Sequence, residues 1–147
     1  MKVYVGSDHN GFKLRATLVS YLQKSGYEVQ DDSTRSLNPD DDYPVFARKV
    51  TADLLSSGDT DERGILICGS GQGMCMAANR YKGIRAALGY DRESARAARS
   101  DDDANILCLA VRTLESENGY AVVDTFLQTP FAAAPRFTRR IKEMDQN

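Results

Sequence analysis

The sequence predicts an α/β protein in which a five-stranded parallel sheet lies between layers of helices, as a three-layer sandwich. Short apolar runs with β-branched residues alternate with stretches that have helical spacing along all 147 residues. The alternation repeats about every 25 to 35 residues, as in βαβ units. A glycine-rich turn also joins one apolar run to the helix that follows it. Since crossovers between parallel strands are right-handed, this order gives one sheet covered on both faces.

The first part of the chain predicts two strands and two helices. Residues 2–6 alternate and contain β-branched side chains, which is typical of a strand. Residues 11–24 carry apolar side chains at helical spacing, and a short strand is expected at 27–30. After a polar loop at 31–42, Pro44 is expected to open the second helix, because proline suits the first helical turn.

The rest of the chain predicts three further strands, each followed by a helix, and one last helix. The strands are expected at residues 65–67, 83–89 and 105–110. The helices are expected at residues 74–79, 91–100, 115–127 and 135–145. Asp91 suits the N-cap of the second of these helices. With no internal repeat and no linker, residues 1–147 are expected to form a single domain.

Composition excludes several classes of protein. The net charge of −2 argues against a nucleic-acid-binding protein. The N-terminus begins directly with a strand pattern, and no apolar run is long enough to span a membrane. The three cysteines (Cys68, Cys75 and Cys108) lack metal-site spacing, which fits reduced thiols and a cytoplasmic location. A single histidine, His9, makes a zinc site unexpected.

The stretch from 63 to 79 carries the strongest functional signal. An apolar strand ends at Cys68, and Gly69, Gly71 and Gly73 alternate with polar residues before a helix. In an α/β sheet such a loop lies at the carboxyl end of a strand, where ligands bind and backbone N–H groups can hold an anion. A thiol there can serve as a base or nucleophile. The alternatives are a βα turn without a ligand and a cysteine that only fills the core.

Two known phosphate-binding motifs do not match this loop. Met74 occupies the place of the third glycine of the dinucleotide fingerprint, and no Gly-Lys-Ser/Thr follows. On the last helix, Arg136 and Arg140 are four residues apart and share one face, which suits phosphate binding or a solvated basic surface. The acidic triplets at 40–42 and 101–103 lack calcium-loop spacing and are interpreted as solvated loop charges.

These motifs together resemble the B-type ribose-5-phosphate isomerases, a family that also holds galactose-6-phosphate isomerase subunits. The resemblance rests on segments 6–12, 42–44, 64–73, 77–79, 83–86 and 105–107, and on Arg112, Arg136 and Arg140. It implies a Rossmann-like fold, a sugar-phosphate substrate, and no metal or organic cofactor. It also implies a homodimer, or a tetramer, whose active sites are shared between subunits.

Residue roles follow from the resemblance by position. Cys68 resembles the base that moves a proton between C1 and C2 through a cis-enediolate, and Ser70 resembles the hydroxyl that assists at the substrate oxygens. The N–H groups of the loop from Gly69 to Gly73 would hold the enediolate. The expected substrate-binding residues are Asp8, His9, Tyr43, Gly69, Gly71, Gly73, Asn105, Arg112, Arg136 and Arg140.

One position departs from the family pattern. Asp101 stands where the family has a histidine that opens the sugar ring, so Asp101 is the expected catalytic residue at this place. Ribose 5-phosphate is the leading substrate, but an aspartate is a poorer proton donor near neutral pH. A tetrose or hexose phosphate is therefore a second possible substrate. Two further hypotheses are a sugar-phosphate-binding module without turnover and a redox-sensing thiol protein.

Overall fold

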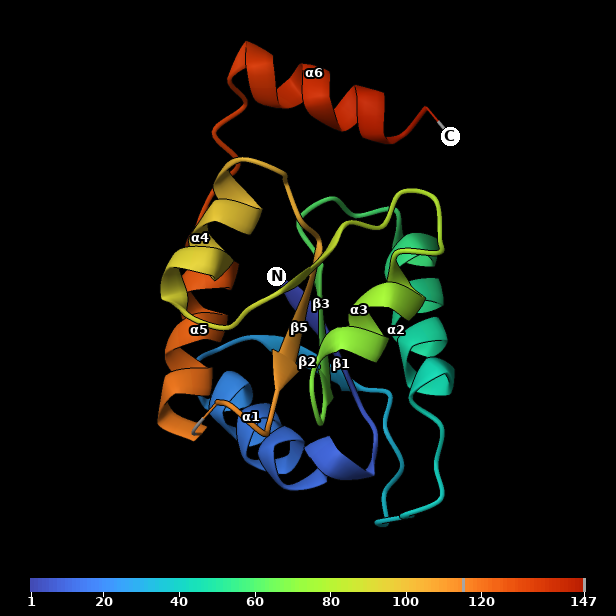
Figure 1. The fold of residues 1–147 in the computed structure, drawn as a ribbon. Helices are drawn as coiled ribbons and strands as arrows, with labels where there is room; N and C mark the ends of the chain where they lie inside the picture. The colour runs from blue at the N-terminus through green and yellow to red at the C-terminus, as the bar shows by residue number, and fades with distance from the viewer. Residues whose placement is uncertain (115, 147) are drawn as a thin grey trace.

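The computed structural model describes residues 1–114 and 116–146 and contains one parallel sheet between two layers of helices (Figure 1). Its five strands lie in the order β2-β1-β3-β5-β4. The strands are β1 (Lys2–Ser7), β2 (Glu28–Asp31), β3 (Arg63–Cys68), β4 (Ala86–Leu88) and β5 (Ile106–Ala110). Every neighbouring pair is parallel. The predicted fold class is thereby confirmed.

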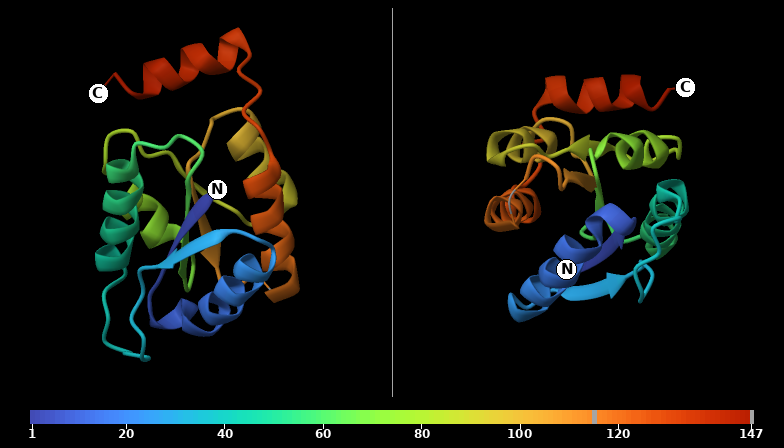
Figure 2. Two further views of the ribbon diagram at one scale, coloured as in Figure 1. Left: turned by 180° about the vertical axis from the view of Figure 1, so that it is seen from behind. Right: turned by 60° about the horizontal axis from the view of Figure 1, so that its bottom comes forward.

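Helices cover both faces of the sheet (Figure 2). They are α1 (Phe12–Lys24), α2 (Tyr43–Ser57), α3 (Gln72–Ala78), α4 (Arg92–Ser100), α5 (Ser116–Gln128) and α6 (Pro135–Met144). A 3-10 turn, His9–Gly11, precedes α1. Helices α1, α4 and α5 pack on one face, and α2 and α3 pack on the other. Glu115, the expected first residue of the fifth helix, lies outside the described residues.

Side chains alternate between the two cores because successive residues of a strand point to opposite faces. In β3, Ile65 and Ile67 join the core under α1, α4 and α5, whereas Leu66 and Cys68 join the core under α2 and α3. All six residues of β3 are buried, as expected for a central parallel strand. The Cys68 thiol therefore faces the α2–α3 side.

Helix α2 approaches the sheet closely because two glycines lie beneath it. A Cβ atom on Gly6 of β1 would come within 2.8 Å of Val50 Cγ2. A Cβ atom on Gly64 of β3 would come within 3.0 Å of Val50 Cγ1 and 2.9 Å of an Ile106 carbon. The side chain of Val50 thus fills the space that the two missing side chains leave, and this contact sets the height of α2 above the sheet.

The predicted strand over 83–89 is too long, since β4 covers only Ala86–Leu88. Gly83 has a φ of +87°, outside the extended region. The Asn105 side chain replaces part of the backbone hydrogen bonding that would extend β4: its Oδ1 accepts the Arg85 N–H at 2.9 Å, and its Nδ2 donates to the Gly83 carbonyl at 2.8 Å.

The predicted cap of α4 is confirmed, because the Asp91 carboxylate accepts the Ser94 N–H at 2.7 Å.

Helix α6 lies across the amino ends of the strands and projects from the two helix layers (Figures 1 and 2). Its carboxyl end meets segment 79–87, where Asp145 lies 3.8 Å from Arg85. Among the described residues of this helix, only Phe137 is buried. Arg136, Arg139 and Arg140 belong to this helix. None of the helices that the structure describes has the length and apolar character required to cross a membrane.

Candidate active site

The glycine loop connects β3 to α3 at the carboxyl edge of the sheet. Cys68, the last residue of β3, is buried, and its Sγ accepts the N–H of Gly71 at 3.1 Å. Gly71 has a φ of +73°, a conformation that favours glycine. Ser70 is exposed, and its Oγ lies 3.4 Å from the Gln72 nitrogen. The loop therefore folds back over the thiol and leaves the Ser70 hydroxyl open to solvent.

Replacing Gly71 with alanine is expected to destabilise the fold by about 2–4 kcal/mol, from backbone strain together with overpacking. The new Cβ would lie 2.4 Å from Leu88 Cδ1 and 3.3 Å from the Leu109 carbonyl carbon. Gly26→Ala is the matched control, since Gly26 has a φ of +89° but nothing within 4 Å of an added Cβ. The free energy of unfolding of both variants, measured in urea, separates backbone strain from overpacking. An equal loss of this free energy in the two variants would contradict the predicted steric contribution.

Tyr43 and Arg112 flank the loop, as expected from the sequence. A Cβ on Gly73 would come within 2.7 Å of the Tyr43 ring, so the ring lies directly against this glycine. A Cβ on Gly69 would come within 3.1 Å of Arg112 Nε. The Arg112 N–H also donates to the Gly69 carbonyl at 3.1 Å. The close approach of both side chains gives Gly69 and Gly73 a steric reason to be glycine.

Asp8 and His9 extend the site from the end of β1. The Asp8 N–H donates to the carbonyl of Ile67 at 3.3 Å, which places this turn beside the end of β3. The buried Asp8 carboxylate accepts the N–H groups of Asn10 and Gly11 at 3.0 and 3.2 Å, so it caps the 3-10 turn. His9 Nδ1 lies 2.8 Å from Asp41 Oδ1, and this hydrogen bond raises the pKa of His9 above its usual value.

The interpretation of the acidic triplets as solvated loop charges is wrong for Asp41 and Asp103, whereas Asp40, Asp42 and Asp102 are exposed. The Asp41 side chain is only 7% exposed because it packs against His9. Asp103 forms ion pairs with Arg85 at 3.0 Å and with Arg99 at 2.7 Å. The missed signal is a partner that is distant in the sequence, His9 for Asp41 and Arg85 for Asp103, or that lies on the preceding helix, as Arg99 does for Asp103. Among the residues that the structure describes, no group of three or more His, Cys, Asp or Glu side chains is placed to hold a metal ion.

The remaining predicted residues lie at the opposite edge of the sheet within the same chain. Asn105 directly precedes β5, and Asp101 caps the carboxyl end of α4, where it accepts the Ser100 hydroxyl. Arg136 and Arg140 lie on α6, across the amino ends of the strands. One chain therefore brings Asp8, His9, Tyr43, Arg112 and the glycine loop together, but not these four residues.

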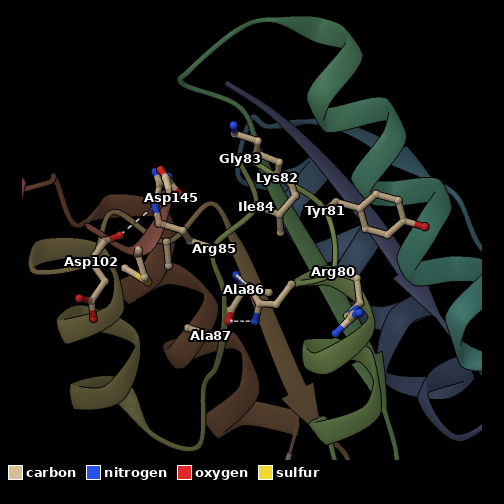
Figure 3. Close-up of a pocket in the computed structure, with 13 residues that line it drawn as sticks. Arg80, Tyr81, Lys82, Gly83, Ile84, Arg85, Ala86, Ala87, Asp102 and Asp145 are labelled. Carbon is tan, nitrogen blue, oxygen red and sulfur yellow. Dashed lines mark hydrogen bonds and ion pairs between the residues drawn. The ribbon is translucent and has the colours of Figure 1, made fainter. Parts of the chain in front are cut away.

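A cavity of about 720 Å³ lies at this amino edge, between segment 79–87 and the end of α6 (Figure 3). Arg80, Lys82, Asp102 and Asp145 are among its lining residues. Cys68 and the glycine loop do not line it. The expected proton transfer needs a base and N–H groups that hold an enediolate. Because the glycine loop carries the Cys68 thiol and these N–H groups, the loop rather than this cavity is the candidate reaction centre of the chain.

The family model described as ribose/galactose isomerase matches residues 3–144. The chain belongs to this family. The family's ribose-5-phosphate isomerase B from Mycolicibacterium paratuberculosis is 39% identical over 141 residues, which cover 96% of this chain and 87% of that protein. The resemblance inferred from the sequence is thus confirmed.

Solved structures of family members share the fold closely. The ribose 5-phosphate isomerase from Thermotoga maritima has 45% sequence identity and a TM-score of 0.93, covering 99% of this chain and 98% of that one. Ribose-5-phosphate isomerase B from Mycoplasma genitalium with bound ribulose-5-phosphate has 36% identity and a TM-score of 0.94. That match covers 99% of this chain and 94% of the other.

Proposed function

We propose that this protein is an aldose–ketose isomerase that interconverts ribose 5-phosphate and ribulose 5-phosphate. The observation that carries the proposal is the Cys68 thiol beneath a loop of glycines that Tyr43 and Arg112 flank. The relative that holds ribulose-5-phosphate supports this choice of substrate. We also infer a cytoplasmic location, supported by the free thiols of Cys68, Cys75 and Cys108.

The loop suits proton transfer next to a carbonyl group. As a thiolate, Cys68 would take the proton from C2 of the open-chain aldose, and the electrons would form a C1–C2 enediolate. The backbone N–H groups between Gly69 and Gly73 would stabilise the developing oxyanion, as in other preorganised sites. The exposed Ser70 hydroxyl would pass a proton between O1 and O2. Return of the proton to C1 completes the ketose, and the Arg112 guanidinium suits the phosphate.

We further infer that two chains form a homodimer and that each site is completed by the partner. The residues expected in one site lie at two opposite edges of the sheet in a single chain. Helix α6 projects from the helix layers of its own chain, as a helix that reaches across a dimer would. Arg136, Arg140 and Asp101 of one protomer would thus join the glycine loop of the other. Asn105 would act mainly by holding Gly83 and Arg85, since its amide is occupied by both.

A panel of four- to six-carbon aldose and ketose phosphates tests the proposed function. We expect interconversion of ribose 5-phosphate and ribulose 5-phosphate to have the highest kcat/KM of the panel. A higher kcat/KM on a tetrose or hexose phosphate would overturn the proposed substrate but support the proposed aldose–ketose isomerisation. Binding without conversion of any member would overturn the isomerase and support a binding module.

The Asp101 position favours a second candidate, an isomerase of a sugar phosphate that needs no ring opening. If this position serves ring opening, Asp101→His is expected to raise kcat/KM on ribose 5-phosphate by about tenfold, since imidazole can donate a proton near neutral pH. The rate on erythrose 4-phosphate, which cannot close a furanose ring through its phosphorylated O4, should change little. The measurement is the ratio of kcat/KM for the two substrates, and an unchanged ratio would remove position 101 from ring opening.

A further inference from the structure

One carboxylate of the 31–42 loop is directed at the turn that follows β1. Asp41 Oδ1 accepts the backbone N–H of His9 at 3.0 Å and lies 2.8 Å from its ring Nδ1. The Asp41 side chain is 7% exposed, whereas its neighbours Asp40 and Asp42 are exposed residues. Among these three acidic residues, Asp41 is therefore the one that is built into the structure around His9.

We propose that Asp41 is a positioning residue that holds His9 as a fixed, protonated cation for the phosphate group of the substrate. This inference rests on the proposed function and deepens it. It assigns a role to a residue that the sequence analysis interpreted only as a solvated loop charge. It also gives the acidic loop a function at the site other than metal binding.

The geometry fixes the orientation of the ring through Nδ1. Because one carboxylate oxygen contacts both the backbone and the ring of His9, the imidazole cannot turn away without losing the contact to Nδ1. Nε2 lies 3.0 Å from the amide nitrogen of Asn10, an exposed residue, and in this contact the neutral ring accepts the amide N–H. In the imidazolium both ring nitrogens are donors, so the Asn10 amide turns away and Nε2–H becomes available to an anion. The His9 side chain is 33% exposed. Nδ1 therefore faces the protein, and Nε2 lies on the accessible side, where an anion can replace the Asn10 amide.

The charges around His9 also favour its protonated form. The hydrogen bond to Asp41 raises the pKa of His9, partial burial opposes it, and the nearby carboxylates of Asp8 and Asp40 add to the increase. The Asp8 carboxylate also accepts the backbone N–H groups of Asn10 and Gly11 and, at 3.2 Å, the side-chain amide of Asn10. Since the pKa in the folded protein is higher than the usual 6.5, the imidazolium persists above pH 6.5. Both the ion pair and anion binding are then lost as the pH rises through the folded-state value.

The single histidine makes a direct experiment possible, because its ring Cε1–H gives one NMR signal. That signal is followed against pH in the wild type, in Asp41→Asn and in the control Asp40→Asn. Asp41→Asn keeps the shape of the side chain but removes the negative charge that contacts His9. Asp40→Asn removes a neighbouring carboxylate that is not hydrogen-bonded to His9. We expect the pKa of His9 to fall clearly in Asp41→Asn and only slightly in Asp40→Asn.

Inorganic phosphate then serves as the ligand, at a fixed pH between the His9 pKa values that the titration gives for the wild type and Asp41→Asn, where their protonated fractions differ most. Phosphate affinity, read from the same signal, is expected to weaken about three- to tenfold in Asp41→Asn, as for one weakened charge-assisted hydrogen bond. It should hardly change in Asp40→Asn. An unchanged His9 pKa in Asp41→Asn, or unchanged phosphate affinity, would overturn the proposal.

The outcomes separate this inference from the proposed function. If no sugar phosphate is isomerised but Asp41→Asn weakens phosphate binding as expected, the proposed reaction fails and the role of Asp41 stands. If ribose 5-phosphate is isomerised with the same KM in the wild type and Asp41→Asn, the reaction stands and the role of Asp41 fails.

Discussion

Replacing Cys68 with alanine is expected to lower the isomerisation rate by about 10²–10⁴, the range that loss of a general base typically causes. In the proposed mechanism the thiol acts in the chemical step, whereas Arg112 and the loop N–H groups bind the ligand. Binding of inorganic phosphate should therefore be largely unchanged. The measurements are kcat on ribose 5-phosphate and the phosphate dissociation constant. Turnover close to the wild-type value would remove Cys68 from the mechanism.

Cys75 provides the matched control for this substitution. It is a half-buried thiol on α3 that donates to the Ala86 carbonyl at 3.2 Å, and contact with Cys108 lowers its pKa. A general sensitivity of the protein to thiol loss would affect both cysteines. Cys75→Ala is expected to retain kcat within about threefold, as for a residue outside the reacting centre, with at most a modest loss of stability. A comparable collapse of kcat in this variant would indicate that Cys68→Ala acts through folding instead.

Mixing two impaired variants is expected to restore activity if the sites are shared between subunits. Cys68→Ala lacks the proposed base, and the double variant Arg136→Ala/Arg140→Ala lacks the proposed phosphate contacts of α6, which should raise KM strongly. A mixed dimer would contain one site with an intact glycine loop and intact arginines. After subunit exchange, about a quarter of the wild-type activity should return at low substrate, because half of the dimers are mixed and each has one complete site.

The control is a mixture of Cys68→Ala with the triple variant Cys68→Ala/Arg136→Ala/Arg140→Ala, in which no complete site can form. This mixture should remain inactive. If the first mixture also stays inactive although mass spectrometry shows that the chains have exchanged, the active site does not combine Cys68 of one chain with α6 of another.

Much of the fold follows from patterns that are local in the sequence. The buried strands Lys2–Ser7 and Ile106–Ala110 were predictable within one residue at each end, because apolar β-branched runs and their polar flanks define them. The strand at Ala86–Leu88 was overestimated, because the Asn105 amide takes the hydrogen bonds of the preceding residues. That contact joins segments about twenty residues apart, and no local pattern reveals it.

The candidate site was predictable in part, for a topological reason. Residues that follow parallel strands meet at the carboxyl edge, so Cys68, Asp8 and Arg112 come together as expected. By the same rule, a helix returns the chain to the amino edge, so Asp101 at the end of α4 had to lie at the other edge. The burial of Asp41 against His9 could not be predicted, because 32 residues separate the two partners.

The close approach of α2 to Gly6 and Gly64 links the interior of the sheet to the proposed substrate site. Val50 rests on Gly6 and Gly64, and seven residues earlier the same helix presents Tyr43 against Gly73. A methyl group added at Gly64 would lift the helix and withdraw the tyrosine wall from the loop, although no pocket residue had changed. Residues under the helix therefore contribute to the position of Tyr43 beside the proposed site, and a comparison restricted to the side chains around the loop would overlook them.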